Sequence, residues 1–436
     1  MNLNQLKSVF KHYGCTRIYV KRLSPNDNSK NQVYLGGSFE VLNILPISQI
    51  ETEAPGDWER ERFKAKLNFA WIDENGMAYP APNTQLILYP KYPEVRMSGF
   101  LLRCKNAPTE LMTQRLDGRL LFLGVNNKGE ILGYVSHPDS AMSREFYNLK
   151  DIENAGIFRV INIVAGNNRN ELLQELLRIN ELGWIRSKRL DKDGNICDCN
   201  ASNCGGYTLE AELGITPNGY AEPDYLGWEI KQFGVSNFDR LDSAVITLMT
   251  PEPNGGFYAE EGIVSFVMKY GYPDKKGRAN RMNFGGVHKA NNLHSVTNLT
   301  ISLIGYDCEE KKIRNANGCI ALIDQKGEPA ATWSFASLLK HWNRKHNQAC
   351  YVPSLSDKEN GLKYRYGHTV KMGIGTDFQL FLEQMSQGKV YYDPGLKVEN
   401  IDTKPKPKNR NQFRVSSKNL GSLYKTTELV NLNTVK

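Results

Sequence analysis

Four side chains that could do chemistry lie between positions 206 and 232 of the chain: Glu210, Asp224, Glu229 and Lys231. Because alternate residues of a strand share a face, Glu229 and Lys231 point the same way from a predicted strand that Asp224 precedes. Two neighbouring carboxylates repel each other unless a cation lies between them, and Mg²⁺ prefers oxygen ligands of this kind. A lysine beside that metal can position the attacking water and offset the charge that builds on a phosphate. The pattern therefore indicates phosphodiester hydrolysis.

The same pattern has a plainer interpretation, because an Asp followed within a few residues by Glu-X-Lys is common by chance. A surface strand with an ion pair on one face would also produce it. Two neighbouring features favour the metal site. The Glu-X-Lys sequence lies in an apolar strand behind a proline turn, and a short helix at 208–213 presents Glu210 upstream.

The spacing of these residues resembles that of the MvaI/BcnI restriction endonucleases, relatives of the MutH mismatch-repair nickase that share the PD-(D/E)XK nuclease core. Glu210 lies fourteen residues before Asp224, four residues separate Asp224 from Glu229, and one separates Glu229 from Lys231. The resemblance also includes segments 323–327, 332–336 and 411–415, and it spans about 167–424.

This resemblance implies a role for each side chain and a class of enzyme. Asp224 and Glu229 would hold Mg²⁺, and Lys231 would be the catalytic lysine. Glu210 would either orient Lys231 or reach the metal through water. The family implies a type II restriction endonuclease that acts as a monomer on a short, pseudopalindromic site in double-stranded DNA, with a cognate DNA methyltransferase encoded by the same host. Relatives are associated with CCWGG-type sites, which gives our expected target.

The segment expected to read bases departs from the family. Family members similar to MvaI place histidines shortly before the Phe-Arg pair, whereas this chain has Lys, Asn, Arg, Asn and Gln there. Arg pairs naturally with guanine, and Asn or Gln with adenine. We therefore expect base readout by different donors and predict DNA contacts from Lys408, Arg410, Asn411, Gln412 and Arg414.

The N-terminal part shows a second resemblance, to the effector domain of EcoRII, a DNA-binding pseudobarrel. It rests on the run at 18–27 and on the polar and aromatic residues that follow it. Such domains insert two arms into the major groove, here at about 21–34 and 94–103, where polar side chains can reach phosphates and base edges. The predicted DNA-binding residues are Lys21, Arg22, Asn26, Asp27, Lys30, Gln32, Tyr34, Glu94, Arg96 and Arg103. A loop that is merely solvated by its charges is the alternative.

Two kinds of domain are needed to position these sites. Residues 1–155 contain β-branched and aromatic segments separated by turns, at 16–23, 62–72, 84–89, 94–103, 119–125 and 130–135, which predicts an all-β DNA-binding pseudobarrel. Residues 167–424 open with a helix at 169–185 and then mix helices, at 333–346 and 376–388, with strands such as 226–233 and 362–372. An α/β nuclease domain with a mixed sheet follows.

The bulk composition limits the class of protein. With 40% hydrophobic residues among 436, the chain is a folded globular protein, and its net charge of +8 includes a basic section after 397. It shows no apolar run long enough for a membrane span and no secretory signal, so we expect a cytoplasmic protein. The eight cysteines are expected to be reduced thiols, and Cys197, Cys199 and Cys204 lack the fourth ligand of a zinc site.

Two other functions are compatible with the same residues. A strand-nicking repair endonuclease similar to MutH would need a partner protein. A DNA-binding regulator with an inactive nuclease core would need no metal, but a silent fold has no need of clustered carboxylates beside a lysine.

Overall fold

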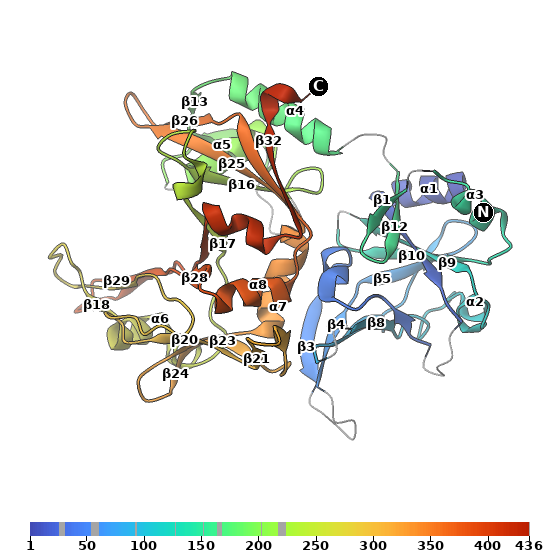
Figure 1. The fold of residues 1–436 in the computed structure, drawn as a ribbon, viewed down its shortest axis with the longest axis horizontal. Helices are drawn as coiled ribbons and strands as arrows, with labels where there is room; N and C mark the ends of the chain where they lie inside the picture. Colours follow the sequence, from blue (N-terminus) through green and yellow to red (C-terminus); the bar gives the residue numbers. More distant parts are fainter. Residues whose placement is uncertain are drawn as a thin grey trace. The chain divides into compact units, whose positions relative to one another are not determined.

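A computed structural model describes residues 1–25, 31–53, 61–91, 94–126, 128–150, 152–163, 168–201, 203–216 and 224–435. The chain forms two compact units, Met1–Gly166 and Asn167–Lys436 (Figure 1). Among the described residues, no helix is long and apolar enough to cross a membrane.

Two sheets make up most of the described part of the N-terminal unit. One has the strand order β11-β12-β1-β9-β10-β5-β6, with β1 at Cys15–Leu23, β5 at Phe69–Ile72, β6 at Ala78–Pro80, β9 at Arg119–Asn126, β10 at Ile131–Ser136, β11 at Glu153–Ala155 and β12 at Phe158–Asn162. The other has the order β2-β8-β7-β4-β3, with β2 at Val33–Tyr34, β3 at Gln49–Glu53, β4 at Arg62–Lys66, β7 at Gln85–Tyr89 and β8 at Glu94–Ser98. The predicted strand at 62–72 is thus two strands, one in each sheet.

Short helices accompany these sheets: α1 at Leu3–His12, α2 at Thr109–Thr113, α3 at Ala141–Tyr147 and the 3-10 helix η1 at Phe39–Asn43. Helix α1 begins with a capping box, because the Asn2 side chain accepts from the Gln5 backbone N–H and the Gln5 side chain accepts from that of Asn2. It buries Leu6 and Phe10 against the seven-stranded sheet, where any Cβ at Gly124 would lie 2.2 Å from the Phe10 ring. Closure of the two sheets into a pseudobarrel stays a prediction.

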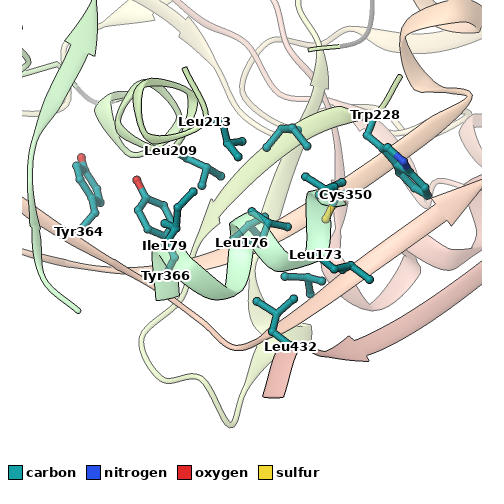
Figure 2. Packing of buried hydrophobic residues seen from close by; sticks show 14 of the residues in the cluster. Leu173, Leu176, Ile179, Leu209, Leu213, Trp228, Cys350, Tyr364, Tyr366 and Leu432 are labelled. Atoms are coloured by element: carbon teal, nitrogen blue, oxygen red, sulfur yellow. The ribbon is translucent and has the colours of Figure 1, made fainter. Parts of the chain in front are cut away.

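The C-terminal unit contains a mixed sheet with the order β13-β26-β25-β27-β32, to which β16 adds in parallel beside β25 (Figure 1). The strands are β13 Ile185–Arg186, β16 Glu229–Gly234, β25 Gln348–Asp357, β26 Lys363–Tyr366, β27 Thr369–Ile374 and β32 Thr426–Asn431. Helices α4, Asn168–Glu181, and α5, Cys204–Glu212, pack on one face of this sheet. Figure 2 shows Leu173, Leu176 and Ile179 of α4 packed with Leu209 of α5 and Cys350 of β25. The expected mixed sheet is therefore present.

Smaller sheets complete this unit, in the orders β17-β31-β28, β18-β19-β29-β30, β20-β23-β24, β14-β15 and β21-β22. Their strands are β14 Lys188–Leu190, β15 Ile196–Asp198, β17 Val245–Met249, β18 Tyr272–Pro273, β19 Arg281–Gly285, β20 Thr300–Ile304, β21 Tyr306–Asp307, β22 Lys312–Ile313, β23 Cys319–Ile323, β24 Pro329–Ser334, β28 Val390–Tyr392, β29 Gly395–Glu399, β30 Lys406–Lys408 and β31 Phe413–Ser416. The helices are α6 Phe257–Tyr270, α7 Phe335–His346 and α8 Phe378–Ser386, with 3-10 helices η2 Leu241–Ser243, η3 Ser417–Leu423 and η4 Leu432–Thr434.

Two expectations from the sequence are wrong here. The predicted single strand at 362–372 is a pair, β26 and β27, because the chain turns back at Gly367, where any Cβ would lie 2.8 Å from the Phe238 ring. Cys199 and Cys204 are joined in a disulfide across a Cα–Cα distance of 5.7 Å, so these two are not reduced thiols. The other six cysteines are free.

Candidate active site

Strand β16 places Glu229 and Lys231 on one face of the mixed sheet. Ile230, between them, is buried with Cys350 and Met372 in the core beneath α4 and α5, so the two charged side chains point to the opposite face. Lys231 Nζ donates to Glu229 Oε1 at 2.6 Å. The Glu229 side chain is only 1% exposed and that of Lys231 is 19% exposed. A buried carboxylate needs such a partner, because burial without one would cost several kcal/mol.

A tight turn leads into this strand. Tyr225 and Trp228 exchange two backbone hydrogen bonds, at 2.9 and 2.8 Å. The two residues between them, Leu226 and Gly227, both have positive φ, 50° and 85°, as a two-residue hairpin turn of type I′ requires. Leu rarely adopts that conformation, and Asn168 Nδ2 donates to the Leu226 carbonyl at 3.2 Å, which helps to hold it. The spacing between Asp224 and Glu229 is therefore the length of a hairpin turn.

This turn folds Asp224 back onto the start of β16. Asp224 Oδ2 accepts from the Ile230 backbone N–H at 3.0 Å, so the carboxylate is fixed beside the strand that carries Glu229 and Lys231. Within the described residues, the structure thus brings three of the four predicted site residues to the beginning of one strand.

Glu210 lies on α5, which packs against the same sheet from the face of Ile230. Helix α5 lies close to this sheet. A Cβ at Gly205 would lie 2.8 Å from Gln232 Oε1, and the Gly205 carbonyl accepts a hydrogen bond from the Tyr366 hydroxyl at 2.7 Å. Glu210 is half-buried. Among the described residues, no three His, Cys, Asp or Glu side chains lie close enough together to bind one metal ion.

The donor set nevertheless fits a magnesium ion. Mg²⁺ keeps several of its waters and is commonly held by one or two carboxylates together with substrate phosphate oxygens. Asp224 and Glu229 supply two such carboxylates, and Lys231 supplies a neighbouring ammonium group. None of these residues supplies the imidazole nitrogen or thiolate sulfur ligands that zinc prefers.

The predicted base-reading segment divides into exposed and enclosed residues. Lys408 and Arg410 are exposed, and Gln412 is half-buried. Asn411 is 1% exposed, accepts from the Tyr392 hydroxyl and donates to Glu252 Oε2 at 2.8 Å. Its amide is therefore buried and hydrogen-bonded within the protein. The Arg414 guanidinium is likewise engaged, with Asp393 at 2.6 Å and Thr247 at 3.2 Å.

A cationic face that was not predicted from the sequence adjoins this segment. In the sheet of β19, β29 and β30, Arg281 lies opposite Glu399, Glu399 opposite Lys406, and Lys397 opposite Lys408. Glu399 forms ion pairs with Arg281 at 3.3 Å and with Lys397 at 2.5 Å, and Arg281 also pairs with Asp274 at 3.3 Å, so four cations face two carboxylates here. These side chains share one face, because Phe284 and Val398 occupy the alternate positions and are fully buried. The period-two alternation of 281–285 and 395–399 was the signal that could have revealed it.

In the N-terminal unit the two predicted arms meet. Tyr34 of β2 lies opposite Arg96 of β8. The Arg96 guanidinium donates to Glu94 and, at 3.2 Å, to Gln32 Oε1, so three predicted contact residues form one hydrogen-bonded group.

The other predicted contact residues of this unit have different surroundings. Arg22 forms an ion pair with Asp117 at 2.5 Å, and Arg103 is exposed with a φ of 60°. Lys21 lies with its Nζ 5.9 Å from the Tyr34 ring centroid. Asn26, Asp27 and Lys30 lie outside the described residues.

A mixed sheet that carries two carboxylates and a lysine at the start of one strand is an arrangement suited to a metal-dependent nuclease. The family model of the MvaI/BcnI restriction endonucleases matches residues 173–424, more than half of the chain, and the chain belongs to this family. It is therefore a type II restriction endonuclease, which confirms the resemblance and the enzyme class predicted from the sequence.

Structures of the restriction endonuclease MvaI are among the solved structures similar to this chain. One is the restriction endonuclease MvaI in complex with its cognate DNA substrate, with 18% identity, a TM-score of 0.46, and coverage of 61% of this chain and 99% of that one. The other is MvaI in the absence of DNA, with 17% identity, a TM-score of 0.34 and the same coverage. No curated protein matches the chain in sequence.

Proposed function

We propose that this protein is a cytoplasmic, Mg²⁺-dependent restriction endonuclease that cuts both strands of DNA at a short pseudopalindromic site of the CCWGG type. The observation that carries the proposal is the 2.6 Å contact between Lys231 and the buried Glu229, beside which a hairpin turn fixes Asp224. A buried carboxylate, a second carboxylate and a lysine at one strand end are the groups that phosphodiester hydrolysis needs.

Each residue has a distinct task in this proposal. Asp224 and Glu229 hold the metal, and Mg²⁺ when bound supplies Lewis-acid polarisation of the scissile phosphate. Lys231, beside Glu229, donates to the attacking water and stabilises the charge that builds on the phosphate oxygens. Glu210 lies on α5 at the face of the sheet opposite Lys231, and its supporting role, by orienting Lys231 or through a water, rests on the family resemblance. The positions are held by packing of β16 and α5, so the groups are ordered before substrate arrives.

DNA is held by both units in this proposal. In the C-terminal unit, Lys406, Lys408 and Arg410 are exposed on or beside the cationic face, and their charge is opposite to that of a DNA backbone. In the N-terminal unit, the group of Gln32, Glu94 and Arg96 presents a fixed guanidinium. Membership of the MvaI/BcnI restriction endonuclease family supports DNA as the substrate here. We propose that the enzyme acts as a monomer, that its N-terminal unit is an effector or recognition module, and that the host encodes a cognate methyltransferase.

The experiment is plasmid cleavage by the wild type, Lys231→Ala and a control, Lys363→Ala, in Mg²⁺ and in Ca²⁺, with the ends mapped by sequencing. Lys363 lies in β26 of the same sheet and is half-buried. We expect discrete double-strand ends at one repeated motif, in Mg²⁺ only, from the wild type and Lys363→Ala. Lys231→Ala should bind DNA without cutting it. Cleavage at the wild-type rate by Lys231→Ala would show that Lys231 is not the catalytic lysine. Nicked plasmid from the wild type would indicate a strand-nicking enzyme instead.

A further inference from the structure

A small cavity lies in the N-terminal unit, where β1 ends and β2 begins. Its volume is about 150 Å³, several times the share of a single water molecule in the liquid, about 30 Å³. The polar side chains that line it are those of Lys21, Ser24, Gln32, Tyr34 and Arg119. Within the described part of the chain, no Asp or Glu lines it.

Arg119 forms the deeply buried wall of this cavity. The residue is 1% exposed, and its guanidinium donates to the carbonyl oxygens of Leu116 at 2.8 Å, Leu111 at 2.5 Å and Ser24 at 3.1 Å. Carbonyl oxygens satisfy the N–H groups but do not neutralise the charge. The neighbouring Asp117 carboxylate is bonded to Arg22 at 2.5 Å. Burial lowers the pKa of Arg119, and the negative charge of Asp117 offsets this lowering only in part.

Lys21 is the second cation at the cavity. It is half-buried, its Nζ lies 5.9 Å from the centroid of the Tyr34 ring, and burial lowers its pKa. Both cations line the cavity, and in a partly dry site each attracts an anion more strongly than it would in water. An anion in the cavity would therefore lie near two positive charges.

We propose that this cavity binds a phosphate group between Lys21 and Arg119. A tetrahedral phosphate carries acceptor oxygens in several directions, and the residues Ser24, Tyr34 and Gln32, which line the same cavity, carry hydroxyl and amide groups that can donate to them. The phosphate comes either from the DNA backbone or from free phosphate in solution. The DNA source rests on the proposed function, whereas binding of the phosphate group does not.

The first arm of the test is the salt dependence of DNA binding by the full chain. Dissociation constants for a short duplex are measured in Ca²⁺ over a range of salt for the wild type, Lys21→Gln, Lys21→Arg and Lys66→Gln. Lys66 is an exposed lysine of β4 and controls for loss of one charge. If a DNA phosphate enters the cavity, Lys21→Gln lowers the slope of log affinity against log salt by about 1, Lys21→Arg restores it, and Lys66→Gln leaves it unchanged.

The second arm uses inorganic phosphate without DNA. We expect phosphate to raise the melting temperature of the wild type above that in chloride at equal ionic strength, and Lys21→Gln, but not Lys66→Gln, to lose this rise. If Lys21→Gln loses the phosphate-induced rise in melting temperature but keeps the wild-type salt slope of DNA binding, the cavity binds free phosphate and not a phosphate of the DNA backbone. A Lys21→Gln protein that matches the wild type in both arms overturns the proposal. A wild type that binds no DNA but responds to phosphate contradicts the proposed function alone.

Discussion

The hydroxyl oxygens of Tyr351 and Tyr424 lie 2.7 Å apart in the interior of the nuclease unit. Tyr351 is the neighbour of Lys231 across β16 and β25, and the Tyr424 ring occupies the space above Gly373, where any Cβ would lie 2.6 Å from it. Burial, and the charge of Glu229, raise the pKa of both phenols. The two phenols are therefore buried and neutral, and they lie beside Glu229 and Lys231 of the site.

The two hydroxyls of this pair should contribute to stability as a unit, so that the losses of unfolding free energy in the two single variants add up to more than the loss in the double variant. Tyr424→Phe and Tyr351→Phe should each lower the free energy of unfolding by about 1–3 kcal/mol, because each leaves the other buried hydroxyl without its partner. The double variant should lose less than the sum of the two. Urea unfolding of the wild type and the three variants measures this coupling. Strictly additive losses would show that the hydroxyls do not depend on each other.

Arg96 offers a test of the DNA contact in the N-terminal unit. Its guanidinium is held by Glu94 and Gln32, so it is ordered before DNA arrives and little conformational entropy is lost on binding. We expect Arg96→Ala to weaken duplex binding by the full chain in a gel shift at fixed salt. Arg62→Ala is the matched control, since Arg62 forms the equivalent ion pair with Glu53 on a neighbouring strand of the same sheet. Equal affinities for the two variants would exclude Arg96 from the interface.

Arg410 separates base reading from backbone binding in the nuclease unit. The residue is exposed and its side chain lies along Gly395, where a Cβ would be 3.2 Å from Arg410 Cδ. If Arg410 reads a guanine, Arg410→Ala should reduce discrimination at one base pair by about 1–3 kcal/mol. Lys408→Ala should weaken binding to all sequences equally, because phosphates carry no sequence information. The measurement is the ratio of cleavage rates on the matched site and on sites with one substituted base pair. If Arg410→Ala keeps the wild-type ratio, Arg410 does not read a base.

The local pattern was sufficient to predict which face of β16 carries the charged residues. Ile230 is buried between Glu229 and Lys231, as strand alternation requires. The strand begins at Glu229, three residues later than the sequence predicts, because nothing in the local propensity of Leu226 reveals a positive φ. That conformation is fixed by the turn and by Asn168, which lies far away in sequence.

Features that depend on the folded arrangement of the chain could not be predicted. Asn411 looked like an exposed base-reading amide, but its partners Glu252, Tyr258 and Tyr392 come together only in the folded chain. The Cys199–Cys204 disulfide depends on a Cα separation that spacing along the chain does not determine. The cavity beside Lys21 is of the same kind, since Arg119 reaches it from a strand almost one hundred residues later.

His288 makes the stability of the nuclease unit depend on pH. The imidazole is fully buried, with Nδ1 2.8 Å from the Gly286 carbonyl and Nε2 2.8 Å from the Thr297 hydroxyl. It stacks on His294 at 4.2 Å. Burial, with the charge of His294, lowers the pKa of His288 to about 4 from an ordinary 6.5. The folded protein therefore holds this side chain neutral across a range in which the unfolded chain binds a proton.

The direction of the effect follows from that difference. Stability is fully present above pH 6.5 and is lost as the pH falls toward 4, because the unfolded state takes up the proton first. Between pH 7 and pH 5 the wild type should lose about 2 kcal/mol of unfolding free energy through this residue. His288→Gln should be less stable at pH 7 but should lose correspondingly less on acidification, and urea unfolding at the two pH values measures both. Parallel losses in the wild type and His288→Gln would assign the acid sensitivity to other groups, since His294 and His341 also have lowered pKa values from burial.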